Sequence, residues 1–201
     1  MFQFSRPTPQ QVEQFLLEQA DLPFSYSSVG ATATTPPAGF DCDRARVRLG
    51  EGEIVFAAAC NALRAWTQFD LGWTAALPRD TPLEGNRVVA VLARACGMWT
   101  LNAARIVYVV NSATQFGFAY GTLPGHVERG EERFLIEIDP ANGTVWYDIL
   151  AFSRPNHAMV RLGYPLVRRL QAKFRCDSAA AMRRAAAREM GHATDEDQRK
   201  E

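Results

Sequence analysis

Five strand-like runs follow one another in the middle of the chain, and the links between them are too short to hold a helix. The runs cover residues 87–96, 103–111, 115–123, 132–139 and 145–152. Parallel strands need a crossover connection of about a dozen residues or more, usually a helix. The spacing therefore predicts an antiparallel meander and not a parallel sheet. The link between the last two runs reads Asp-Pro-Ala-Asn-Gly-Thr, a turn sequence typical of a hairpin.

Helical patterns flank the meander. Thr8 can cap a helix that has Pro9 at its first position, and Gln11 completes a capping box. The expected elements outside the meander are helices over 9–22, 52–69 and 164–190, a helical stretch from Pro155, a loop over 23–40 and an edge strand over 41–49. We expect a single α+β domain over residues 1–190 and a disordered polar tail over 191–201.

The third run divides its side chains by size. On an extended strand, one face carries Phe116, Phe118 and Tyr120, and the other carries Gly117, Ala119 and Gly121. We interpret the aromatic face as core. The bare face predicts a bend in the sheet or another element packed close to the backbone. The end of the run, Thr122–His126, is expected at the rim of a cavity.

The distribution of charge and the spacing of the cysteines limit the kinds of site that the chain can form. The formal net charge is zero, but residues 1–153 carry −5 and residues 154–190 carry +7. This asymmetry indicates a solvated helix face or, alternatively, a surface for an anion or a partner. The cysteines stand at positions 42, 60, 96 and 176, too far apart for a CxxC-type metal or redox pair.

Sequence motifs for common cofactors and reactions are missing. No glycine-rich phosphate loop and no GxSxG nucleophile motif occurs, so neither a cofactor nor a metal is predicted. Strand aromatics could stack on bases, but the acidic first part of the chain lacks a basic groove, which argues against nucleic acid. The apolar runs are far shorter than the ~18 residues of a membrane span. Without a signal-peptide pattern, a soluble cytoplasmic protein is expected. The oligomeric state is left open.

Six side chains are candidates for a binding site: Arg105, Tyr108, Tyr120, His126, Glu137 and Tyr147. His126 follows Pro-Gly at a strand end, where a functional residue can sit. Glu137 and Tyr147 lie on facing strands of the predicted hairpin. Burial would raise the pKa of Glu137 unless an arginine such as Arg105 or Arg154 pairs with it. A structural ion pair and a general base are the two interpretations of this glutamate.

Three groups of residues resemble one family, called domain of unknown function 1990. They are Asn102-x-x-Arg-x-x-Tyr108, then Phe116-Gly-Phe-Ala-Tyr-Gly-Thr-Leu-Pro-Gly-His126 with Gly130-Glu-Glu132, and then Ala151-Phe-Ser-Arg-Pro155 with Gly163-Tyr-Pro. The resemblance covers roughly residues 20–185. It brings no established activity and no catalytic residues. The order of elements is similar to the START/Bet v 1-like helix-grip fold, in which a curved sheet wraps a long helix and leaves an apolar cavity.

The expected fold is therefore α+β, with a curved antiparallel sheet of six or seven strands wrapped around the C-terminal helix. Leu166, Leu170 and Phe174 should press on the sheet. The first functional hypothesis is a protein that binds a small apolar or amphipathic molecule in the cavity, oriented by the six candidate side chains. The second is an enzyme that uses the same cavity with Glu137 or His126 as acid or base. The third is an interaction module that uses the arginine-rich helix on an anionic surface.

Overall fold

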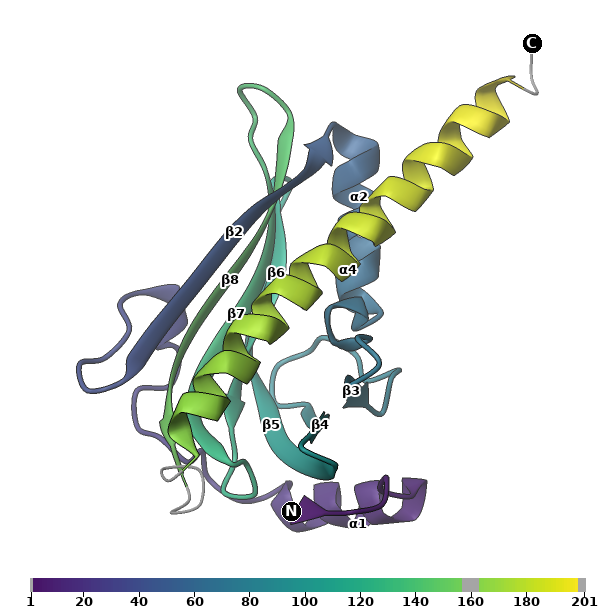
Figure 1. Cartoon of the computed structure of the whole chain (residues 1–201). Coiled ribbons are helices and arrows are strands. Elements are labelled where there is room, and N and C mark those ends of the chain that lie inside the picture. The colour runs from purple at the N-terminus through teal and green to yellow at the C-terminus, as the bar shows by residue number, and fades with distance from the viewer. Residues whose placement is uncertain (1, 157–162, 199–201) are drawn as a thin grey trace.

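The chain folds as a strongly curved antiparallel sheet with a long helix across its concave face (Figure 1). The computed structural model describes residues 2–156 and 163–198. In chain order the elements are β1 (Phe2–Gln3), α1 (Pro9–Gln19), η1 (Ala31–Ala33), β2 (Asp41–Glu51), α2 (Glu53–Arg64), η2 (Thr67–Phe69), β3 (Thr74–Leu77), β4 (Val88–Ala95), β5 (Met98–Asn111), β6 (Gln115–Thr122), β7 (Glu128–Ile138), β8 (Thr144–Pro155) and α4 (Tyr164–Gln198).

The sheet has the predicted meander at its centre. Its strand order is β2-β8-β7-β6-β5-β4-β3, and β1 pairs with the start of β5. Neighbours along this order are antiparallel, and β4 to β8 follow one another as in the sequence. The edge strand expected at 41–49 is β2, which pairs with β8. β1 and β3 were not predicted, because one is two residues long and the other four.

The aromatic face of β6 is core, as predicted. Phe118 lies opposite Phe134 of β7, which in turn lies opposite Ile149 of β8, and all three are fully buried. Phe69 of η2 packs on this layer, with its ring centroid 5.5 Å from that of Phe134. The second half of α4 closes the core together with α2, where Met182 is fully buried. The concave face is thus filled at one end by aromatic and aliphatic side chains.

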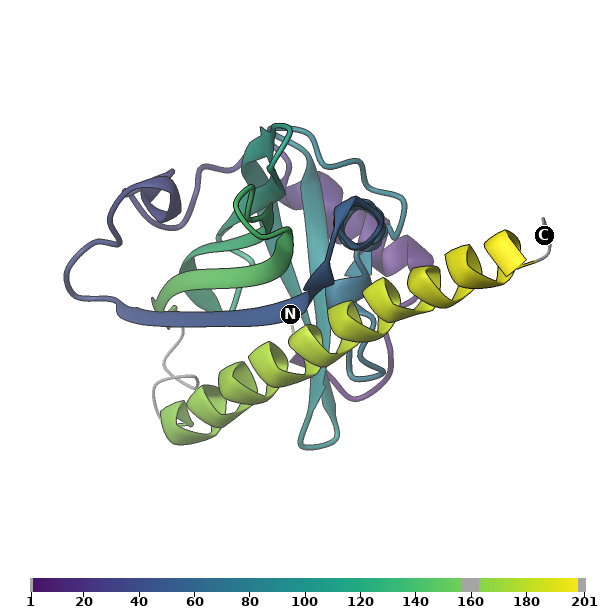
Figure 2. The ribbon, with the colours of Figure 1, turned by 90° about the horizontal axis from the view of Figure 1, so that it is seen from above.

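The bare face of β6 is the convex face, and another segment does approach it closely. A Cβ atom added to Gly121 would lie 2.2 Å from the Tyr26 hydroxyl and 2.9 Å from the Phe24 ring. Figure 2 shows α4 along one side of the curved sheet and the segment with η1 on the opposite side. The convex face of β3 to β5 is covered by α1, through Val12 and Phe15. The prediction of close packing at Gly121 is confirmed.

The first helix of the chain begins where the sequence predicts, whereas the C-terminal region differs from the prediction. The capping box of Thr8 and Gln11 is present at the start of α1. Pro155 ends β8, and the helical stretch expected after it falls on residues 157–162, which lie outside the described residues. α4 continues to Gln198, beyond the expected end of the helix at residue 190. The disordered tail expected over residues 191–201 stays a prediction, and residues 199–201 lie outside the described range.

Candidate functional site

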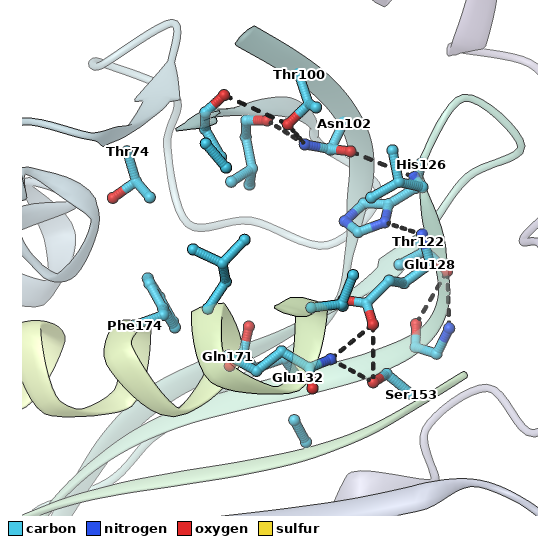
Figure 3. A pocket seen from close by; sticks show the side chains of 18 of the residues that line it. Thr74, Thr100, Asn102, Thr122, His126, Glu128, Glu132, Ser153, Gln171 and Phe174 are labelled. Carbon is cyan, nitrogen blue, oxygen red and sulfur yellow. Dashed lines mark hydrogen bonds between the residues drawn. The ribbon is translucent and has the colours of Figure 1, made fainter. Parts of the chain in front are cut away.

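A cavity of about 470 Å³ lies between the concave face of the sheet and the first half of α4 (Figure 3). Its walls are mainly apolar and come from β3, β4, α4 and the segment that follows η2. The apolar lining includes Phe69, Trp73, Val91, Leu166, Leu170 and Phe174. The apolar residues expected on α4 therefore face this space, and among them Phe174 also reaches the sheet, 6.3 Å from the Phe134 ring centroid. Sites of this size and composition are typical of small-molecule pockets, which span roughly 300–1,000 Å³.

One end of the cavity is polar. Glu128 and Glu132 project into it from β7, since alternation along the strand places both on the face of Phe134. Glu132 accepts a hydrogen bond from the Tyr120 hydroxyl at 2.6 Å. Glu128 accepts one from the Gln171 side-chain amide of α4, also at 2.6 Å. The hydrogen bonds given to these two carboxyl groups by side chains thus come from neutral donors.

Burial shifts the ionisation of both carboxyl groups in the same direction. Removal from water raises the pKa of Glu132 to about 7, and the nearby charge of Glu128 adds to the shift, while the hydrogen bond from Tyr120 opposes it. Burial also raises the pKa of Glu128, against the lowering effect of the hydrogen bond from Gln171. Two acids whose pKa values are raised by burial therefore lie at one end of an otherwise apolar space.

The nearest guanidinium groups are bound elsewhere. Arg168 of α4 forms a two-pronged ion pair with Asp43 of β2, one contact measuring 2.8 Å. Arg175 reaches the same carboxylate at 3.2 Å. Among the side chains of residues 2–156 and 163–188, neither Glu128 nor Glu132 forms an ion pair with a cationic group. These contacts hold the start of α4 against the sheet edge. Arg168 and Arg175 therefore act on Glu128 and Glu132 only at a distance, and their charges lower the pKa values of the two glutamates against the effect of burial.

Two of the six predicted residues line the cavity. Tyr120 does so through its contact with Glu132. His126 lies at the rim, where its Nδ1 accepts a hydrogen bond from the Glu128 backbone N–H at 3.0 Å. Asn102, which stood in the family-like motif, also lines the space, but its amide is held by the Val91 carbonyl and by Thr100.

The structure places Arg105 and Tyr108 on the opposite, convex face. Arg105 donates hydrogen bonds to the backbone carbonyls of Ala20 and Leu22, the latter at 2.9 Å, so it anchors the end of the α1 segment. Tyr108 shares a 2.8 Å hydrogen bond with Thr32. Both residues therefore have structural partners outside the cavity, and their expected place in it is wrong.

Glu137 and Tyr147 do not share a face. In the observed register Glu137 lies opposite Trp146, whereas Tyr147 lies opposite Ile136. Glu137 is on the convex face, where it pairs with Arg46 and accepts a hydrogen bond from Gln115 at 2.8 Å. The structural ion pair is thus the correct interpretation of Glu137, with Arg46 as its partner in place of the arginines considered above.

Tyr147 is on the concave side but does not line the cavity. It is fully buried in the core, where its hydroxyl shares a 2.8 Å hydrogen bond with Ser178 of α4. It therefore joins the sheet to the helix. The acid–base role suggested for Glu137 in a cavity has no basis in this geometry.

Glu128, Glu132 and Gln171 are the polar residues that sequence reasoning missed. The signal for the two glutamates was present, because the alternation that places Phe134 and Ile136 on one face continues backwards to both. The predicted strand began at residue 132, so it included Glu132 but ended short of Glu128. For Gln171 no local pattern on α4 distinguishes it from a surface residue.

Other kinds of site find little support in the described residues. Among them, no three His, Cys, Asp or Glu side chains form a group that could hold a metal ion. Nor does any described helix combine the length and apolar character needed to cross a membrane. On α4, Lys173 pairs with Asp177, in addition to the arginines bound to Asp43. Part of the positive charge of this helix is thus paired with acidic groups of the same chain, which weakens the hypothesis that the helix binds an anionic partner.

Solved structures with similar backbones have low sequence identity and moderate overlap. A hypothetical protein from Helicobacter pylori is 12% identical, with a TM-score of 0.49 over 79% of this chain and 95% of its own. The protein Ara h 8.0201 is 12% identical, with a TM-score of 0.43 over 72% and 98%. Human STARD10 is 11% identical, with a TM-score of 0.42 over 94% and 86%. The helix-grip assignment rests on the sheet order and the position of α4 described above.

Sequence comparison gives a firmer relationship. A UPF0548 protein of Dictyostelium discoideum is 35% identical over 206 aligned positions, which cover 92% of this chain and 95% of the relative. A UPF0548 protein of Deinococcus radiodurans is 37% identical, covering 83% and 89%. A family model described as "Domain of unknown function (DUF1990)" matches residues 25–181. The chain therefore belongs to the DUF1990 family, as the sequence motifs indicated.

Proposed function

We propose that this protein binds a small molecule with an apolar body and one polar end in the cavity between the sheet and α4. The observation that carries the proposal is the division of the cavity itself. About 470 Å³ of space is walled mainly by apolar side chains. The carboxyl groups of Glu128 and Glu132, with Gln171, lie at the end formed by β7 and the start of α4, whereas Thr74 and Thr100 line it elsewhere. Pockets for small molecules have this composition, in which a few polar groups orient an apolar ligand.

The packing around the cavity supports a preformed site. The second half of α4 is buried against α2, and the first half is tied to β2 by the ion pairs of Asp43. These contacts fix the position of the helix above the cavity. The side chains that line an empty cavity lack van der Waals contacts on that side. An occupant would restore them.

The test uses 1-decanol as a neutral probe, followed by the fluorescence of Trp73, which lines the cavity. Ala151 also lines it, so Ala151→Phe should fill part of the space and weaken binding at least tenfold. The matched control is Ala172→Phe, at an exposed position of α4. This variant should bind like the original protein.

Native mass spectrometry of the protein purified from its own host gives an independent readout. We expect a bound species that is reduced in Ala151→Phe and retained in Ala172→Phe. Decanol binding that is equal in the two variants, or no binding of decanol together with a bare protein mass, would contradict the proposal.

A further inference from the structure

The polar end of the cavity carries an excess of acid. The charged side chains that face it are Asp43 of β2, Glu128 and Glu132 of β7, and Arg175 of α4. Arg175, together with Arg168, is bound to Asp43. The acidic side chain of Glu131 also belongs to β7 but points to the convex face, where Tyr26 and Thr32 hold it. Two glutamates on one strand therefore share the end of the cavity, and the guanidinium groups of Arg168 and Arg175 form their ion pairs with Asp43 instead of with them.

The side chains that donate hydrogen bonds to the two carboxyl groups are neutral. His126, at the same end, accepts a hydrogen bond at Nδ1 from the Glu128 backbone N–H. Tyr120, Gln171 and Ser153 are neutral donors to the two carboxyl groups. A carboxylate in such a place repels the other, and the charges of Arg168 and Arg175, which are shared with Asp43, offset only part of the cost of its removal from water.

We infer that the ligand of this cavity is an amphipathic amine, whose ammonium group lies between Glu128 and Glu132 and whose apolar part lies along the α4 side. This inference rests on the proposed function. An ammonium group offers up to three hydrogen bonds and a positive charge, so it can donate to a carboxylate at this end of the cavity and offset the charge of both. A fatty acid of the same length would add a third negative charge at this end. An alcohol would supply one donor and no charge.

The test compares three probes with the same chain: decylamine, 1-decanol and decanoate, each below its micelle-forming concentration. Hydrogen bonds that involve charged groups are stronger than those between neutral groups. We therefore expect decylamine to bind about 10- to 100-fold more tightly than decanol at pH 8. Decanoate should bind more weakly than decanol. Isothermal titration calorimetry at pH 6 in two buffers of different ionisation enthalpy should show protons released as decylamine binds, because the ammonium group displaces the proton of Glu132.

Variants on one strand separate the head-group contact from the general state of the fold. Glu132→Gln and Glu128→Gln should each lower the ratio of decylamine affinity to decanol affinity at least tenfold. Both variants should bind decanol as the original protein does. Glu137→Gln makes the same chemical change on the convex face of β7 and should preserve the preference. Retained decanol binding in the first two variants shows that the cavity is still formed.

The outcomes distinguish this inference from the proposed function. If decanol binds but decylamine binds no better, or if decanoate binds best, the amine is the wrong class while the cavity remains a binding site. If the amine preference is the same in Glu132→Gln, Glu128→Gln and Glu137→Gln, the inferred contact is wrong. If none of the three probes binds, the proposed function fails, and the inference fails with it.

Discussion

Replacing Glu131 with glutamine should destabilise the fold far more than this small change suggests. The carboxylate of Glu131 is 2% exposed on the convex face. One of its oxygens accepts from the Tyr26 hydroxyl at 2.6 Å and from the Gly30 N–H at 2.7 Å. The other accepts from the N–H of Thr32 at 2.9 Å and from the Thr32 hydroxyl. This cage pins the segment before β2 over the sheet.

The size of the effect follows from the donors around the two oxygens. Hydroxyl groups can rotate and accept, but a backbone N–H cannot. In Glu131→Gln the new NH₂ group must therefore face either the N–H of Gly30 or that of Thr32. An orphaned buried donor costs about 1–3 kcal/mol, and bonds to a charged acceptor are stronger than bonds to a neutral amide. Burial of an amide costs less than burial of a charge, which offsets part of the loss. We expect a net loss of about 2–4 kcal/mol.

Urea unfolding followed by circular dichroism measures this loss, with Glu137→Gln as the control on the same strand. Glu137 is partly exposed and pairs with Arg46, so its substitution should cost at most about 1 kcal/mol. The melting temperature of Glu131→Gln should fall by roughly 4–16 °C. Hydrogen exchange at Gly30 and Thr32 should accelerate. A loss no greater than that of Glu137→Gln, with unchanged exchange at these amides, would refute the cage as a stabilising feature.

Three further predictions concern the close approach at β6, the core and the cavity. Gly121→Ala should cost about 1–3 kcal/mol because its methyl group meets Tyr26, whereas Gly85→Ala, with open space around it, should be close to neutral; urea midpoints compare the two. Phe134→Ala should cost about 3–5 kcal/mol in the same assay, and a loss below 1 kcal/mol would contradict its place at the centre of the core. Because burial raises the pKa of Glu132 from 4.5 to about 7, the folded state holds the extra proton between these pH values, and the free energy of unfolding should fall by about 2–3 kcal/mol as pH rises through this window. Glu132→Gln should flatten that decline when unfolding is measured from pH 5 to pH 8, and an equal decline in the variant would rule out Glu132 as its source.

The strands were predictable because their side-chain periodicity is local. The aromatic and bare faces of β6 could be told apart from the sequence, and both the buried core at Phe118 and the close contact at Gly121 agree with that interpretation. β3 was missed because four residues are too few to show a period of two. The capping box of α1 was predictable because Thr8 and Gln11 are three residues apart.

The site was predicted less well than the fold, because its residues depend on register. Tyr120 and His126 do line the cavity. Glu137 and Tyr147 were expected on one face, but the observed pairing aligns Glu137 with Trp146 and thus sends the two to opposite faces. A shift of one residue in a strand pair reverses every side chain, and the turn sequence alone did not fix the alignment.

The sequence by itself determined the family, the antiparallel meander, the long C-terminal helix and the two unlike faces of β6. These features follow from local chemistry, namely side-chain period, turn residues and capping residues. Only the tertiary structure decided which face is concave, and that Glu128, Glu132 and Gln171 meet at one end of a cavity. Those residues come from β7 and α4, and what brings them together is the curvature of the sheet and the ion pairs of Asp43 with the helix. Such long-range contacts have no local signature, which is why the acidic end of the cavity emerged only from the folded chain.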